Sequence, residues 1–333
     1  MKKIVGIIAA AAILATSVFA ADVSATAKVS SNLFTSADGA RTLFETLNNA
    51  QTADYATLFS LQVSTDNAGG GVKYWGGKGV NIDMSKLLEP DYEPGVSDLV
   101  AFGAYNVWFK PTDNLKLSFR ENGGGLFGDK YHGYYANNVA GYGAGYGASI
   151  SLDALAIDIC FKEGFMSKAK DQDAVIGQLG AKIGYNADFG SIAAIFSADK
   201  NFKAFEIGAG YQGSFDVVGV VFNVGAKIAD SKTTIGINPS AGGNIDAISW
   251  AIDVPVTIAD DTSVGLNAKA GYALDNVKFT FRFEDSNLMA KEFDATIGLA
   301  IEGNVGIAAW KVDPNFGVKA KKFAVGFEAG VNF

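Results

Sequence analysis

Residue types that perform nucleophilic or acid–base catalysis are scarce in this sequence. The chain has one His and one Cys. His132 lies in a stretch rich in Gly and Tyr, where a lone His is far more often solvent-exposed than catalytic. Asp260 and Asp261 are adjacent carboxylates, but they lie in an expected turn, where Asp is favoured because it hydrogen-bonds to the backbone. We therefore expect no enzymatic activity.

Cofactor and metal chemistry lacks support in the sequence as well. Gly69-Gly70-Gly71 and Gly123-Gly124-Gly125 are not followed by Lys and Ser or Thr at a helix start, as a phosphate-binding loop requires. No Cys and His cluster has metal-ligand spacing, and Cys160 alone cannot form an intramolecular disulfide. The net charge of −8 argues against a nucleic-acid partner, because phosphate binding needs a basic surface. We expect no cofactor and no metal.

The first twenty residues have the pattern of a secretory signal peptide. Lys2 and Lys3 form a positive segment, residues 4–14 form a short apolar run, and Ala20 fits the position before a signal-peptidase cut. The run is shorter than the ~20 residues of a membrane-spanning helix. We expect residues 1–20 to be removed on export and residues 21–333 to form a single domain. Removal would take away two of the 27 basic residues and none of the 35 acidic ones, so the mature chain would be more acidic still.

Alternation of apolar and polar residues is the main structural signal in the rest of the chain. Alternating segments recur with about the length that a tilted membrane strand needs, ~9–11 residues. In one of them, Phe205, Ile207, Ala209 and Tyr211 alternate with Glu206, Gly208, Gly210 and Gln212. A soluble β-sandwich also alternates. Apolar faces rich in Ala and polar faces rich in Gly favour instead an all-β protein, a closed antiparallel transmembrane β-barrel with lipid outside and a polar lumen.

Aromatic residues precede several expected short turns and orient the strands. Examples are Trp108 with Phe109, Tyr185, Phe215 and Tyr272, and Phe333 ends the chain in the same way. Ring side chains favour the boundary between lipid and water, so we place the short turns on the periplasmic side. The longer links would then face outward, at residues 35–54, 84–97, 121–141, 163–174, 230–245 and 313–321.

The strand count depends on one short segment. About seventeen candidates are visible, whereas a barrel with both ends in the periplasm needs an even number. Thr233–Ile237 can be an extra strand or part of a loop. We predict about sixteen strands, with 14 to 18 as the range.

The last eleven residues carry a resemblance to a known family. Phe327, Ala329, Val331 and Phe333 are apolar at alternate positions, and the terminal residue is aromatic. This pattern resembles the closing strand of bacterial outer-membrane β-barrels of the porin type. The resemblance implies that Phe327, Val331 and Phe333 form an assembly signal read by the barrel-assembly machinery. It also implies a location in the bacterial outer membrane, contact with outer-membrane lipid, and assembly as a homotrimer.

The polar positions of the strands predict the lining of a pore. The basic candidates are Lys116, Arg120, Lys162, Lys182, Lys227, Lys269, Lys278, Arg282 and Lys322. The acidic candidates are Asp158, Glu206, Asp253, Glu284, Asp294, Glu302 and Glu328. Because the two signs are close to balance, the acidic excess lies in loops and turns. Fixed charge acts over a Debye length of ~8 Å at physiological salt, so we expect only a weak preference for cations.

Residues 121–141 form the longest link rich in Gly and Tyr. By our strand order it is the third outward loop, which folds into the channel in porin-type barrels. If it does so here, Glu121 and Asp129 narrow the pore opposite Arg120 and Lys162. The alternative is an ordinary surface loop exposed to solvent.

Three functions stay open on the sequence alone. The first is a porin that passes small hydrophilic solutes and ions, because a barrel of about sixteen strands leaves a water-filled channel. The second is a substrate-selective carrier, although Asp22–Ser31 already alternate as a strand and leave little chain for a plug. The third is a surface adhesin or antigen that is only anchored by its barrel.

Overall fold

The computed structural model describes residues 22–37, 40–45, 48–49, 54–55, 57–83, 95–127, 141–162, 179–199, 202–229 and 231–332. Two compact units divide the chain. Unit 1 comprises Met1–Tyr105, Gly271–Arg282 and Asp294–Phe333, and unit 2 comprises Asn106–Ala270 and Phe283–Phe293. The regular elements within the described ranges are β-strands. Among these residues there is no helix of the length and apolar character needed to cross a membrane. The expected signal peptide, residues 1–20, lies outside the described residues.

In unit 1, the earliest and the latest strands of the chain are neighbours. Its complete strands are β1 (Asp22–Ala37), β2 (Ala40–Glu45), β3 (Asn48–Asn49), β4 (Asp54–Tyr55), β5 (Thr57–Ser64), β6 (Ala68–Asp83), β21 (Ala295–Val305), β22 (Ala308–Gly317) and β23 (Lys322–Asn332). β1 pairs antiparallel with β5 on one side and with β23 on the other, where Thr26 lies opposite Asn332. β22 pairs with β21 and β23. β1 therefore has a partner along both of its edges.

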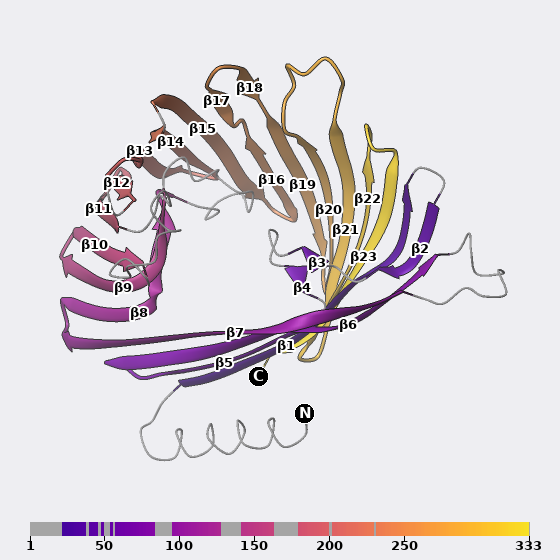
Figure 1. The fold of residues 1–333 in the computed structure, drawn as a ribbon, viewed down its shortest axis with the longest axis horizontal. Helices are drawn as coiled ribbons and strands as arrows, with labels where there is room; N and C mark the ends of the chain where they lie inside the picture. The colour runs from indigo at the N-terminus through magenta and orange to yellow at the C-terminus, as the bar shows by residue number, and fades with distance from the viewer. Residues whose placement is uncertain are drawn as a thin grey trace. The chain divides into compact units, whose positions relative to one another are not determined.

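In unit 2 the strands from β8 (Leu115–Gly125) to β15 (Lys232–Ile245) form an antiparallel meander in which each strand pairs with the next (Figure 1). β15 pairs in turn with both Ile248–Asp253 and Val256–Ile258. Its complete strands are β8 (Leu115–Gly125), β9 (Gly141–Leu152), β10 (Leu155–Lys162), β11 (Leu179–Ala187), β12 (Gly190–Ala198), β13 (Phe205–Phe215), β14 (Val218–Ala229), β15 (Lys232–Ile245), β16 (Ile248–Asp253), β17 (Val256–Ile258) and β18 (Thr262–Val264). β7 (Gly95–Thr112), β19 (Leu266–Leu274) and β20 (Val277–Asp285) have residues in both units.

The described part of the chain has eighteen strands. In this count β16 and β17 are one strand, β18 and β19 are one strand, and the short β2, β3 and β4 are left out. The prediction of sixteen is therefore wrong, although eighteen falls within the predicted range. The uncertain segment Thr233–Ile237 belongs to β15, which pairs with β14 from Lys232 opposite Ala229 to Gly243 opposite Val218. Asn238-Pro239 in its middle is typical of a turn, yet Pro239 loses only its N–H, and its carbonyl accepts a bond from Val254 N at 3.0 Å.

Two of the predicted outward links are also wrong. Residues 230–245 contain β15, and residues 313–321 contain the second half of β22, so only Val318–Lys321 form a turn there. In both segments a Pro and several small polar residues are paired into the sheet, since neighbouring strands supply their hydrogen bonds. Residues 84–94, 128–140 and 163–174 of the other links lie outside the described residues.

Asp residues set several of the two-residue turns. Asp153, Asp216, Asp246 and Asp275 begin such turns with φ between 40° and 54°. This left-handed conformation is what hairpin turns of type I′ need at their first position, and Asp tolerates it better than most residues. These turns join β9 to β10, β13 to β14, β15 to β16 and β19 to β20. Their neighbours Leu152, Phe215, Ile245 and Leu274 are exposed apolar residues.

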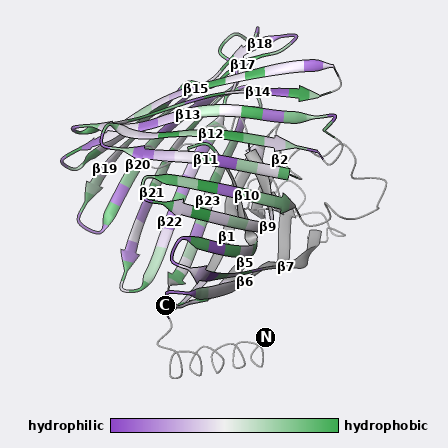
Figure 2. Cartoon of the chain, turned by 90° about the vertical axis from the view of Figure 1, so that its left-hand side faces the viewer, coloured by the Kyte–Doolittle hydropathy of each residue, from purple (hydrophilic) through white to green (hydrophobic). Residues whose placement is uncertain are grey.

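The strands of each unit have one apolar and one polar face, and their residues alternate in hydropathy (Figure 2). In β14, Phe222 is 46% exposed while the adjacent Asn223 is fully buried. The exposed apolar residues include Ile207, Leu299 and Phe109, whereas small and polar residues occupy the opposite face. Water-soluble proteins rarely expose such large continuous apolar areas, so the apolar face is suited to lipid.

Candidate functional site

Charged residues of the polar face in unit 2 lie opposite residues of the other sign. Asp158 of β10 is in register with Lys182 of β11, and Glu206 of β13 is in register with Lys227 of β14. Side chains of directly paired residues share a face of the sheet, where opposite charges attract. These four predicted pore-lining residues are thus brought together as two neutral pairs.

Lys116 and Asp158 are both in register with Ser149, so they lie on the same face of the sheet. Its Nζ is 4.7 Å from the centroid of the Trp108 ring, close enough for a cation–π contact. Trp108 is paired with Ser118 and lies on this polar face as well. Of the two aromatic residues predicted to mark the lipid boundary here, only Phe109 lies on the apolar face, where it is half-exposed. Tyr185, Phe215 and Tyr272 are exposed beside short turns, as expected for residues at a lipid boundary.

A short segment after β8 lies against the polar face of unit 2. Lys182 Nζ donates to the carbonyl oxygens of Gly125 at 2.9 Å and Leu126 at 2.6 Å. Asn223 Nδ2 donates to the carbonyl oxygen of Phe127 at 3.0 Å. We call Gly125–Phe127 the loop anchor. The predicted link at residues 121–141 is therefore too long, because residues 121–125 belong to β8 and Gly141 starts β9. The loop anchor consists of the last residue of β8 and the two residues that follow it.

Small residues on the polar face make room for the loop anchor. Leu126 is buried in a cluster with Cys160, Ala193 and Ile195, and Phe127 packs against the cluster. A Cβ at Gly210 would lie 3.0 Å from the Phe127 ring and would also collide with Asn223 Oδ1. The Gly-rich polar face that the sequence predicted therefore has a specific use here, because it accepts an apolar segment.

Asp253 faces the polar side but is fully buried. Ser240 Oγ donates to its Oδ1 at 2.6 Å, and Asn267 Nδ2 donates to its Oδ2 at 3.1 Å. These bonds occupy both carboxylate oxygens, which stabilises the charge where water has no access. Asp253 is thus a structural group of the wall between β15, β16 and β19 rather than one that is exposed to solutes.

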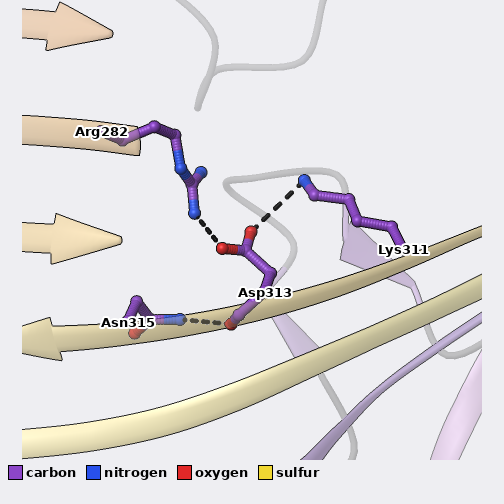
Figure 3. A network of polar contacts seen from close by, with 4 residues as sticks. All are labelled: Arg282, Lys311, Asp313 and Asn315. Atoms are coloured by element: carbon purple, nitrogen blue, oxygen red, sulfur yellow. Dashed lines mark hydrogen bonds and ion pairs between the residues drawn. The ribbon is translucent and has the colours of Figure 1, made fainter. Parts of the chain in front are cut away.

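A second charged network lies in unit 1 (Figure 3). Arg282 of β20 reaches Asp313 of β22 across β21, and Lys311 Nζ lies 3.3 Å from the other oxygen of Asp313. Gly298 of β21 permits this contact, because a Cβ there would lie 3.0 Å from the Arg282 guanidinium. Asn315 Nδ2 donates to the Asp313 carbonyl at 3.2 Å.

Lys311 and Asp313 are functional candidates that the sequence analysis missed. The signal was present, since Lys311, Asp313 and Asn315 alternate with Trp310, Val312 and Pro314. The predicted link at residues 313–321 includes Asp313 and Pro314, but Pro314 is paired with Val325 inside the sheet.

A row of alternating charge crosses the four strands from β20 to β23. Lys278 Nζ lies 3.4 Å from Glu302 Oε1, Glu302 is in register with Lys311, and Lys311 is in register with Glu328. These residues line a pocket of about 340 Å³, together with residues of the turn at Asp275 and Asn276. The row contains two positive and two negative groups.

The remaining predicted residues are placed less completely. Lys269 is partly buried on β19, Asp294 is exposed just before β21, Glu284 lies on β20, and Lys322 starts β23. The backbone is described at Arg120, Glu121 and Lys162, which belong to strands, but their side chains are not among the described parts of the chain. Asp129 lies outside the described residues. Phe327 and Val331 are paired with Val312 and Ala308, and Phe333 lies outside the described residues.

Comparison with known proteins gives a match in fold only. No protein-family model matches the chain, and no curated protein matches its sequence. Three channels of Pseudomonas aeruginosa match in structure. OccK2 (OpdF), solved in complex with glucuronate, has a TM-score of 0.57 and 10% identity, over 94% of this chain and 96% of its own. OpdK, solved with vanillate, has a TM-score of 0.56 and 8% identity, over 93% of this chain and 98% of its own. OccK8 (OprE) has a TM-score of 0.55 and 8% identity, over 94% of this chain and 98% of its own.

These similarities extend over nearly the whole of each chain, at identities that establish the fold and nothing finer. The relatives in fold are channels, and none is described as an enzyme. Together with the pairing of β1 and β23, they identify the architecture as an all-β, closed antiparallel barrel. This chain has the fold of a bacterial outer-membrane channel.

Proposed function

We propose that this protein is a diffusion channel that passes small hydrophilic solutes and ions across the outer membrane with a weak preference for cations. One observation carries the proposal: charged groups of the polar face lie in register with, or form ion pairs with, groups of the opposite charge. Asp158 with Lys182, Glu206 with Lys227, and Arg282 with Asp313 are examples. A wall of neutral pairs projects little field into a pore, so it selects weakly between ions.

The preferred sign follows from the whole chain. The net charge is −8, while the described pairs are neutral, so the acidic excess lies outside them. At the pore mouths such charge enriches cations within a Debye length of ~8 Å. The measurement is the reversal potential of purified protein in a planar bilayer under a KCl gradient. We expect a small potential of the sign that cation preference produces; a clear anion preference would contradict the proposal.

A constriction by residues 121–141 is part of this proposal. The loop anchor supports it, because Gly125–Phe127 lie on the polar face, bonded to Lys182 and Asn223. Glu121 and Asp129 flank the anchor in the chain and would bring carboxylates into the channel beside Arg120 and Lys162. They would contribute to the cation preference.

A substrate-selective channel is the second candidate. The pocket of about 340 Å³ favours it, and so do the structures of OccK2 (OpdF) with glucuronate and OpdK with vanillate. Liposome swelling separates the two functions. A diffusion channel passes neutral sugars at rates that fall smoothly with size, whereas a selective channel excludes sugars smaller than its own solute.

Export and assembly complete the proposal. We expect residues 1–20 to be cleaved and Phe327, Val331 and Phe333 to be recognised by the barrel-assembly machinery. Phe327 and Val331 are part of β23, the strand that pairs with β1. The homotrimer stays a prediction, and cross-linking of the protein in native membranes is its test.

A further inference from the structure

The pocket in unit 1 is formed on the polar face at the end that carries the two-residue turns. It is lined by Ala273, Lys278, Glu302, Ala309, Lys311 and Glu328, among others. The two Ala residues are small, which leaves space between the longer charged side chains. Its volume of about 340 Å³ is many times the ~10–15 Å³ that a single water molecule needs on the same measure. A solute of the size of an amino acid fits in it.

The charges around the pocket are arranged in alternation. Neighbouring strands lie ~4.8 Å apart, so Lys278, Glu302, Lys311 and Glu328 present positive and negative groups in turn along one row. The Lys278 and Glu302 side chains are 45% and 40% exposed. They are therefore solvated and accessible to a solute, and their ion pair at 3.4 Å is of the weak, exposed kind that a competing charge can replace.

This arrangement discriminates by charge pattern rather than by net charge. A small anion attracted by Lys278 or Lys311 is repelled by Glu302, which lies between them. A small cation attracted by Glu302 or Glu328 is repelled in the same way by Lys311. A molecule that carries an ammonium and a carboxylate group satisfies a neighbouring Glu and Lys together. We propose that the pocket is a binding subsite for small zwitterionic solutes, which bind by their carboxylate to Lys278 or Lys311 and by their ammonium group to Glu302 or Glu328. The subsite rests on the proposed channel function only for access of the solute to the polar face.

Binding is measured by saturation-transfer NMR on the detergent-solubilised protein, with four solutes of similar size. These are L-alanine as the zwitterion, propionate as the anion, isopropylammonium as the cation and propane-1,2-diol as the neutral compound. We expect transfer to alanine to exceed transfer to the other three. Equal transfer to all four, or stronger transfer to propionate, overturns the proposal.

Two paired variants locate the subsite without changing the net charge. Lys278→Gln with Glu302→Gln and Lys311→Gln with Glu328→Gln each remove one ionic pair and leave the other, so each double variant should weaken alanine binding about twofold. The quadruple variant removes both pairs and should weaken alanine binding roughly tenfold, or ~1.4 kcal/mol. The two double variants cover the case that the quadruple variant does not fold. Glu206→Gln with Lys227→Gln is the matched control from unit 2 and should leave alanine binding intact.

The readouts separate this subsite from the channel function. Ion conductance of the same samples in a planar bilayer tests the channel, while NMR tests binding in detergent. Conductance without preferential alanine binding overturns the subsite alone. Full alanine binding by the quadruple variant also overturns it, as does full binding by both double variants if the quadruple variant does not fold. Binding without conductance supports the subsite while it contradicts the channel.

Discussion

The Arg282–Asp313 contact shows how a residue on the wall influences its partner across an intervening strand. Both side chains are partly buried, and Lys311 shares the Asp313 carboxylate. Removing one member of such a set leaves the other charge uncompensated on the polar face. Ion selectivity should therefore respond to single substitutions more strongly than to balanced ones.

Arg282→Gln should increase the ratio of cation to anion permeability about twofold, because the net charge that faces the pore becomes more negative while salt screens the change. Asp313→Asn should lower the ratio by a similar factor. The double variant should return close to the original value, because one positive and one negative charge are removed together. Reversal potentials in a KCl gradient measure all three. Shifts of the reversal potential in the same direction for the two single variants, which add up in the double variant, would contradict the pairing of Arg282 with Asp313.

Lys182 is the second residue whose role can be tested singly, because its ammonium group donates to two carbonyls of the loop anchor. Lys182→Met should release the anchor, at a loss of roughly 1.5–3 kcal/mol per charged hydrogen bond. The expected result is greater open-channel current noise and a higher mean conductance. Lys227→Met is the matched control, since it removes the same charge from a neighbouring cross-strand pair. Identical noise in the two variants would contradict an anchoring role for Lys182.

The loop anchor is an element whose position can be trapped chemically. Leu126 and Cys160 are buried in one cluster, and Cys160 is the single Cys of the chain. Leu126→Cys should therefore form a disulfide with Cys160 under mild oxidation and lower the current noise reversibly upon reduction. Leu126→Cys with Cys160→Ser cannot form this bond and serves as control. A failure to cross-link in folded protein would contradict the packing of the anchor on the polar face.

The Asp-led turns make an element-level prediction about folding. Asp246 has a φ of 51°, a conformation that costs a β-branched residue roughly 1–2 kcal/mol. Asp246→Val should lower the urea midpoint of unfolding in detergent, whereas Asp246→Gly should not, because Gly adopts positive φ freely. Asp261→Val, in an exposed turn residue without positive φ, is the control. Equal effects of the Val substitutions would show that the backbone conformation is not the cause.

The alternation of residues predicted most elements, and it failed where turn-like residues are paired. Phe222, Val224 and Ala226 of β14 alternate as expected, and the structure confirms this strand. β15 was missed because Asn238 and Pro239 weigh toward a loop, and their pairing depends on β14 and β16. Lys311 and Asp313 were missed for the same reason beside Pro314. The loop anchor was not predictable in detail, since Leu126 and Phe127 carry no periodic signal and their site is formed by strands distant in sequence.

At the scale of the whole molecule, the large apolar residues lie on the surface. Phe109, Ile207, Phe215, Phe222 and Leu299 are among many exposed apolar side chains, while the described buried hydrophobic cluster is small. The described residues form no packed interior large enough to hold the chain together in water. Its stability must come from an apolar environment around the barrel.

The protein should therefore stay folded only in detergent or lipid. Dilution of folded protein below the micelle concentration should cause aggregation, seen by sedimentation. Folded protein in detergent should migrate faster in an unheated denaturing gel than after boiling. A monodisperse, folded monomer in plain buffer would contradict the assignment of the apolar face to lipid.

The pairing of β1 with β23 has a consequence for the order of events in the cell. Thr26 is paired with Asn332, so β1, one of the first strands to be synthesised, can complete its pairing only after β23, one of the last, has been made. Contacts of such long sequence separation form slowly. The sheet cannot be completed progressively during synthesis or translocation, and any copy cut short by premature termination before β23 would leave β1 as an open, adhesive edge.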